Sequence, residues 1–214
     1  MAKAYVVGGK LVQIGQASQD YPQEVRTLLG DAAPAEVTML GNAEILQSRK
    51  LAIFCSVRCP GKLILAAHDF CQELKNKKVT VAGGFHSPVE RECLNILLRG
   101  FGSIIVSPAR GLERMRVPTE HRTAMDQGRI LYLSPFKNRE RRPTAQMADF
   151  RNRFVAALAD SVFVAYAHPG SKTEELCREL LGWKKPVFAL ESDLNANLFL
   201  LGAQPVRPVT MLLA

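Results

Sequence analysis

A short apolar run at Val162–Tyr166 constrains the fold most. It follows a helical pattern at residues 154–158 and is β-prone throughout, so it predicts a strand covered on both faces. After a Pro-Gly turn, Ser171 and Glu174 have the spacing of a capping box, which places the start of the next helix. The segment therefore predicts a helix, a buried strand, a tight turn and a second helix.

The same alternation runs through most of the chain. Helical patterns separate apolar runs and predict right-handed β-α-β units. We therefore expect an α/β fold: a Rossmann-like, doubly wound and mainly parallel sheet with helices on both faces. The predicted strands are 51–55, 79–82, 103–107, 130–133, 162–166 and 186–190, and the predicted helices are 63–74, one that starts after Ser87, 120–127, 151–158, 171–181 and 195–201.

The first part of the chain is less regular. Residues 5–14 read as a small hairpin turned by Gly8 and Gly9, residues 21–29 as a short helix, and residues 37–41 as an extended piece. We expect residues 1–48 to be a lead-in packed on the core and residues 49–214 to be the Rossmann-like domain.

Composition limits the class of protein. The formal charge of +8 and the pI of about 9.4 suit a polyanionic partner. No apolar run reaches the roughly 20 residues of a membrane span, so we expect a cytoplasmic protein without membrane contact. The five cysteines have no C-x-x-C spacing, which favours reduced thiols, most of them buried.

Basic residues concentrate in the middle of the chain. Between residues 110 and 153 eleven bases face five acids, and arginine, which binds phosphate through a fork of N–H groups, predominates. We predict an exposed basic face here, although a solvated surface is the alternative. The bases are Arg110, Arg114, Arg116, Arg122, Arg129, Lys137, Arg139, Arg141, Arg142, Arg151 and Arg153.

Four loops follow predicted strands and should meet at one edge of the sheet, where ligands of such folds bind: 56–61, 83–87, 107–111 and 167–171. Backbone N–H groups of the Gly83-Gly84 and Gly170-Ser171 turns could hold a phosphate, or the glycines could serve only the tight turns that the fold needs. His86 and His168 lie in these loops as candidate anion ligands or idle side chains. No histidine has a metal-site spacing.

With these loops placed, the chain resembles the DNA-processing protein A (DprA/Smf) family, part of a wider group that includes the Lonely Guy proteins. The resemblance rests on Asp20-Tyr21-Pro22, Leu40-Gly41-Asn42, Pro118-Thr119-Glu120 and, above all, Arg151-Asn152-Arg153-Phe154 with Gly170-Ser171 downstream. It implies a divergent, stand-alone member that binds single-stranded DNA and presents it to a RecA-type recombinase, as a homodimer. It also implies that Arg151 and Arg153 are groove residues.

The family has a glycine-serine-arginine turn after its first strand, and this chain has Cys55-Ser56-Val57-Arg58, so Arg58 is the shifted candidate. His86-Ser87 replaces an arginine-glycine pair of the family. The predicted nucleic-acid or phosphate ligands are Ser56, Arg58, Gly83, Gly84, His86, Ser87, Arg110, Arg151, Arg153, Gly170, Ser171 and Lys172.

An enzyme is the alternative, although we favour binding without catalysis. Residues 169–175 resemble a shortened Lonely Guy motif, which implies a phosphoribohydrolase that uses Glu174 or Glu175. The same glutamates could simply cap a helix and complement its dipole. A nucleotide sensor without turnover is a third hypothesis. We expect no cofactor and no metal.

Overall fold

The computed structural model describes residues 11–137 and 139–206. Within these residues the strands form one sheet in the order β1-β2-β6-β5-β4-β3-β7-β8-β9. The six central strands and β9 run parallel, whereas β1 and β2 join antiparallel at the β6 edge. The strands are Val12–Gly15 (β1), Glu36–Gly41 (β2), Lys50–Phe54 (β3), Thr80–Gly83 (β4), Ile104–Val106 (β5), Ile130–Ser134 (β6), Ser161–Val164 (β7), Val187–Leu190 (β8) and Gln204–Val206 (β9).

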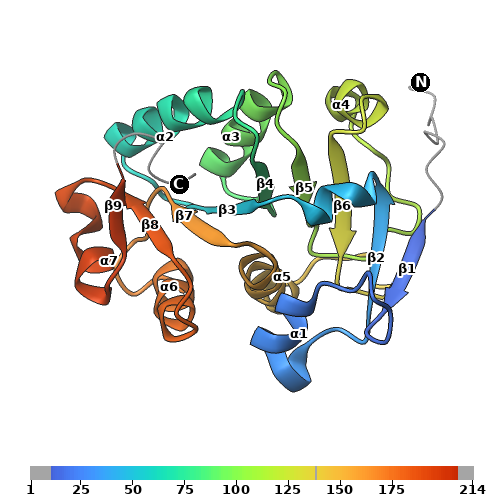
Figure 1. Cartoon of the computed structure of the whole chain (residues 1–214). Coiled ribbons are helices and arrows are strands. Elements are labelled where there is room, and N and C mark those ends of the chain that lie inside the picture. Colours follow the sequence, from blue (N-terminus) through green and yellow to red (C-terminus); the bar gives the residue numbers. More distant parts are fainter. Residues whose placement is uncertain (1–10, 138, 207–214) are drawn as a thin grey trace.

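Helices cover both faces of this sheet (Figure 1). Helices α2, α3 and α4 lie on one side, and α1, α5 and α6 lie on the other. The helices are Gln23–Leu29 (α1), Gly61–Leu74 (α2), Pro88–Leu98 (α3), Arg122–Asp126 (α4), Ala145–Leu158 (α5), Lys172–Gly182 (α6) and Ala196–Leu201 (α7). The predicted doubly wound, mainly parallel α/β fold is thus confirmed.

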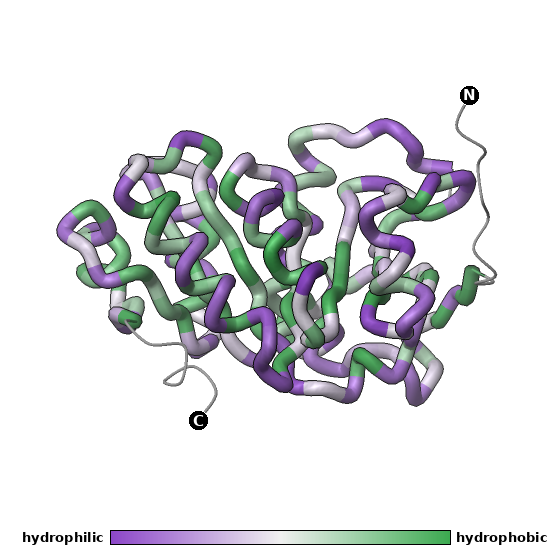
Figure 2. The backbone as a smooth tube through the Cα atoms, turned by 90° about the horizontal axis from the view of Figure 1, so that it is seen from above, coloured by the Kyte–Doolittle hydropathy of each residue, from purple (hydrophilic) through white to green (hydrophobic). Residues whose placement is uncertain are grey.

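The sheet divides the apolar interior into two cores. Successive side chains of β3 alternate between them: Leu51 and Ile53 face α2 and α3, and Ala52 and Phe54 face α5. On the α2 side, the rings of Phe70 and Phe163 stack with centroids 3.9 Å apart. Figure 2 shows hydrophobic backbone segments crossing the middle of the molecule between more polar outer turns. Burial on both faces explains why the strand sequences are continuously apolar.

Local capping signals place two helix starts as predicted. Ser87 and Glu90 form a capping box with Pro88 in the first turn of α3. At α6, Ser171 accepts a hydrogen bond from the Glu174 N–H, but the Glu174 carboxylate reaches Gly170 rather than Ser171. Helix α5 differs from the prediction because Thr144 caps it, so that it begins at Ala145 and not at Arg151. Arg151 therefore lies in the middle of a helix.

The lead-in extends the sheet itself. Strand β1 pairs with β2, which pairs with β6, so residues 12–41 continue the hydrogen-bonded ladder of the core. The predicted hairpin falls partly on residues 1–10, outside the described part. Strand β9, which no sequence pattern predicted, adds a further parallel strand beside β8. A domain boundary near residue 48 stays a prediction.

The cysteines carry no disulfide in the described residues: Cys55, Cys71, Cys93 and Cys177 are buried and Cys59 is half-buried.

None of the described helices combines the length and apolar character that crossing a membrane requires.

Gly41 ends β2 with a φ of 116°, and a Cβ there would lie 2.3 Å from the carbonyl oxygen of Ile130. We predict that Gly41→Ala lowers the free energy of unfolding by about 2–4 kcal/mol, because it adds both backbone strain and a clash with a neighbouring strand. Gly61→Ala is the control, since a Cβ at Gly61 meets nothing within 4 Å. Urea unfolding measures both, and equal effects of the two substitutions would contradict this account.

Candidate nucleic-acid interface

The loops that follow the parallel strands meet at one edge of the sheet, which we call the rim: residues 55–60, 84–87, 107–118, 135–144 and 165–171. Backbone hydrogen bonds join neighbouring loops. The Ser56 N–H donates to the Tyr166 carbonyl oxygen at 2.9 Å, and the Gly111 N–H donates to that of Glu140 at 2.7 Å. The predicted meeting of the four loops at one edge is therefore observed, and the loop after β6 joins them.

A buried glutamate organises the centre of the rim. One carboxylate oxygen of Glu90 accepts the Cys55 N–H at 3.0 Å, and the other accepts the N–H groups of His86 at 2.9 Å and Ser87 at 3.4 Å. This carboxylate links the loops after β3 and β4. The N–H groups of His86 and Ser87, which directly follow the predicted Gly83-Gly84 phosphate turn, are therefore already engaged.

A second glutamate does the same at the α6 turn. The Glu174 carboxylate accepts the Gly170 N–H at 2.9 Å and the Asn197 side-chain amide at 2.5 Å, and only 9% of Glu174 is exposed. These hydrogen bonds, first that from Asn197 and then that from Gly170, lower its pKa. One oxygen thus serves the turn, which agrees with the capping interpretation, and the other links the turn to α7. Glu175 is exposed.

Arg151 is buried, which corrects the prediction that it lines an open groove. Only 3% of it is exposed, its Nη1 donates to the Ser107 carbonyl oxygen at 2.8 Å, and its Nε donates to Asn152. The guanidinium also fills the space beside Gly84, where a Cβ would lie 1.8 Å from Nη1. Burial lowers the pKa of Arg151, and the charge of Glu90 opposes that shift. Arg151 therefore supports the rim from inside.

Two other predicted ligands are paired with acids. The Arg153 guanidinium contacts Glu179 of α6 at 2.6 Å, and Lys172 pairs with Asp149 of α5. Both pairs lie between α5 and α6, where Lys172 and Glu175 also line a small hollow. Their positive charge is partly neutralised in place.

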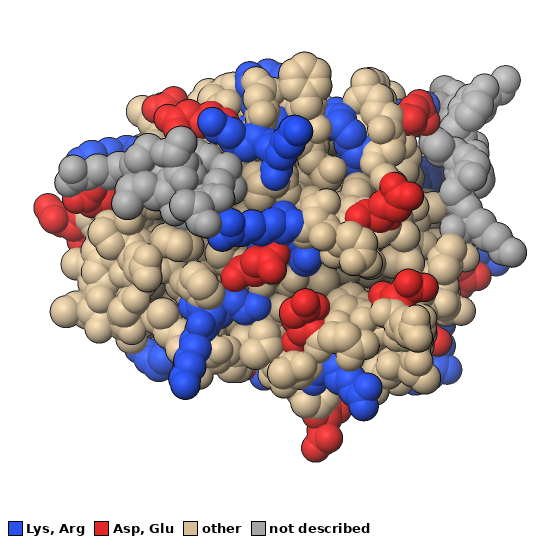
Figure 3. Space-filling model, viewed as in Figure 1, with Lys and Arg blue, Asp and Glu red and all other residues tan. Residues whose placement is uncertain are grey.

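Exposed cationic side chains remain along the rim. Arg58 follows β3, and Arg139 and Arg142 belong to the loop after β6; none of these three forms an ion pair in the described residues. His86 after β4 and His168 after β7 are also exposed, and half-buried Arg110 donates to the Gly111 carbonyl oxygen. Figure 3 shows basic side chains gathered across the middle of the molecule, with acidic ones among them.

The remaining predicted positions are buried or internal. Ser56 is buried and accepts the His168 N–H at 3.1 Å, while Gly83 lies inside β4 and Ser87 caps α3. The position of Arg129 corrects the prediction that the bases between residues 110 and 153 form one exposed face. It precedes β6 at the opposite edge of the sheet, where it donates to the carbonyl oxygens of Gly102 and Leu98.

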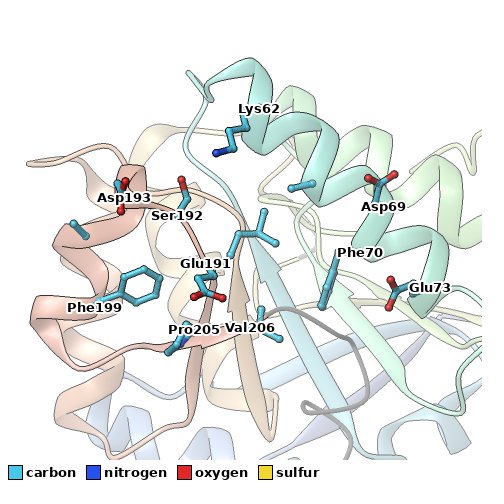
Figure 4. A pocket seen from close by; sticks show the side chains of 13 residues that line it. Lys62, Asp69, Phe70, Glu73, Glu191, Ser192, Asp193, Phe199, Pro205 and Val206 are labelled. Atoms are coloured by element: carbon cyan, nitrogen blue, oxygen red, sulfur yellow. The ribbon is translucent and has the colours of Figure 1, made fainter.

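A large hollow at another part of the surface suits a phosphate poorly. It has a volume of about 770 Å³ and lies between α2, the end of β8 and α7 (Figure 4). Four acids, Asp69, Glu73, Glu191 and Asp193, line it against one lysine, Lys62. Their negative charge would repel a nucleic-acid strand, so the rim arginines mark the better site.

The two neighbouring arginines of α5 should behave differently on substitution. We predict that Arg151→Met lowers the free energy of unfolding by about 2–4 kcal/mol, because it leaves buried Glu90 and the Ser107 carbonyl without this cation. Arg153→Met is the matched control and should cost about 1 kcal/mol or less, as exposed ion pairs do. Denaturant unfolding compares them; a harmless Arg151→Met would contradict the internal role.

Glu174 and Glu175 provide a second matched pair. Because the pKa of Glu174 is lowered in the fold, its stabilisation is present above the unfolded-state pKa and is lost as pH falls through the folded-state value. We predict that Glu174→Gln costs about 1–2 kcal/mol near neutral pH. Its difference from the wild type should shrink in acid, and Glu175→Gln should change little. Thermal unfolding from pH 3 to 7 measures this, and a pH-independent difference would refute it.

Comparison with known proteins agrees with the sequence resemblance. A family model described as DNA recombination-mediator protein A matches residues 13–204. The structure of DNA processing protein A from Streptococcus pneumoniae has a TM-score of 0.79 and 23% identity, over 95% of this chain and 74% of that one. That of Helicobacter pylori, described by its single-stranded DNA binding mode, has a TM-score of 0.75 and 20% identity, over 95% and 94%.

More distant structures share the fold alone. The molybdenum cofactor binding protein of Rippkaea orientalis is 14% identical with a TM-score of 0.54, over 78% of this chain and 93% of that one. Curated proteins gave no match. Because the family model covers most of the sequence, the chain belongs to the DNA recombination-mediator protein A (DprA) family.

Proposed function

We propose that this chain binds single-stranded DNA along the rim. The observation that carries the proposal is the order of the arginines and histidines in the rim loops. Arg139 and Arg142 follow β6, Arg110 follows β5, His86 follows β4, Arg58 follows β3 and His168 follows β7, which is the order of those strands in the sheet.

The loops that carry these side chains therefore follow one another along the edge of the sheet. Adjacent strands are about 4.8 Å apart, so a row over five strands extends roughly 20 Å, a length that several nucleotides of an extended strand can follow. The relative from Helicobacter pylori is described as binding single-stranded DNA, which supports the same ligand here.

The mode of binding follows from the engaged N–H groups. Since Glu90 and Glu174 occupy backbone donors of two rim turns, phosphates would contact the side chains of Arg58, Arg139 and Arg142 instead. Guanidinium groups can bind phosphate through two parallel N–H donors. Phe136 and Phe150 pack edge to face with centroids 5.9 Å apart, and each is half-buried, so a base could stack on an exposed edge of this pair.

Membership of the recombination-mediator family supports a further part of the proposal, that the bound strand is presented to a RecA-type recombinase by a homodimer. The family match is what favours this part.

We predict that log affinity for an oligothymidylate falls with log salt concentration with a slope of about −2, since each phosphate neutralised on a single strand contributes about −0.7 and we expect Arg58, Arg139 and Arg142 to contact one phosphate each. Arg58→Gln should weaken binding at low salt and reduce the slope by about 0.7. Fluorescence anisotropy at several salt concentrations, with a duplex of equal length for comparison, measures both.

Lys78→Gln is the control, because Lys78 is exposed just before β4 at the opposite edge of the sheet. It should leave affinity and slope unchanged. Absence of binding at low salt, or equal losses for Arg58→Gln and Lys78→Gln, would overturn the proposal.

A further inference from the structure

Another hollow opens at the rim, on the α3 side of the sheet. It has a volume of about 590 Å³ and lies between α3, the ends of β4 and β5, strand β6 and residues 115–121; we call it the α3 pocket. Pockets of 300–1,000 Å³ suit ligands the size of a nucleotide. Arg58, Arg139 and Arg142 are not among the residues that line it.

The wall of the α3 pocket carries a buried hydrogen-bonded pair. The His121 Nδ1 and the Tyr132 hydroxyl are 2.5 Å apart, and these residues are only 7% and 3% exposed. Burial lowers the pKa of His121 and raises that of Tyr132, so a neutral imidazole faces a protonated phenol. Whichever of the two groups donates, this hydrogen bond fixes the orientation of the imidazole in the pocket wall.

The remaining charges of the pocket are of both signs. Arg91 from α3 and Arg116 from the loop after β5 are exposed, and neither forms an ion pair within the described ranges. Glu92 and Glu120 line the same hollow. A ligand that satisfies this set needs an anionic group for the arginines and N–H or O–H donors for the carboxylates. A phosphate joined to a sugar and an amino-bearing base has both.

We propose that the α3 pocket binds a nucleoside 5′-monophosphate unit, with its phosphate on Arg91 and Arg116 and its base against the Tyr132 wall. This inference goes beyond the proposed rim function, because it assigns a second site on different residues. The unit is either a free nucleotide or one nucleotide of a DNA strand, and both present the same chemistry.

The test is calorimetric titration of AMP and CMP into the full chain at low salt. Wild-type protein should bind at least one of them, and Arg91→Gln combined with Arg116→Gln should weaken that binding by about tenfold or more, since the change removes charged hydrogen bonds to the phosphate. Adenosine, which lacks the phosphate, should respond little to the double substitution. Arg99→Gln, a change just beyond the end of α3, is the control and should bind as the wild type does.

Two further arms complete the experiment. Tyr132→Phe keeps the ring but removes the hydroxyl that orients His121, and should weaken binding several-fold in protein whose melting temperature shows that it is folded. Competition with an oligothymidylate distinguishes the two kinds of ligand. If the oligothymidylate displaces the bound AMP or CMP, the pocket is assigned to a nucleotide of a DNA strand. If the AMP or CMP stays bound, the pocket is assigned to a free nucleotide.

The proposal is overturned if neither nucleotide binds the wild type at millimolar concentration. It is also overturned if Arg58→Gln weakens nucleotide binding and the combined Arg91→Gln and Arg116→Gln substitution does not. Because Arg58→Gln tests the rim independently, either proposal can fail without the other.

Discussion

Two buried charges of opposite sign hold the rim together. Glu90 accepts N–H groups from the loops after β3 and β4, and Arg151 donates to the loop after β5 while it fills the space beside Gly84. The negative charge of Glu90 favours the charged form of Arg151. Burying a charge away from water costs free energy, so each of these side chains must keep its partners. A substitution of either residue would therefore loosen several loops at once.

In this arrangement, the residues that support the rim differ from those that are available to bind a ligand. In many phosphate sites, the N–H groups of a helix start contact the ligand directly. Here the carboxylates of Glu90 and Glu174 take that place at two turns, and the positive charge available to a ligand lies instead on exposed arginines farther out. Such a surface suits a flexible polyanion, since long side chains can adjust to phosphates at varied positions and require no single register.

The sequence predicted most of the fold because its signals were local. Continuous apolar runs identified six parallel strands, and Ser87 with Glu90 identified the start of α3. Strand β9 was missed because three residues that include a proline carry almost no pattern. The start of α5 was missed because Thr144 ends a polar loop and no capping glutamate follows three residues later, so the helix seemed to begin at Arg151.

The candidate site was predicted less completely. Sequence alone determined that loops with glycines, serines and basic residues follow the parallel strands, because strands, helix caps and composition are recognised from neighbouring residues. Only the tertiary structure decided which arginines face solvent. Arg151 and Arg153 are two residues apart on one helix, yet one side chain lies against the sheet and the other against Glu179 of α6. The physical reason is that burial and ion pairing depend on elements far away in the chain, which no local pattern specifies.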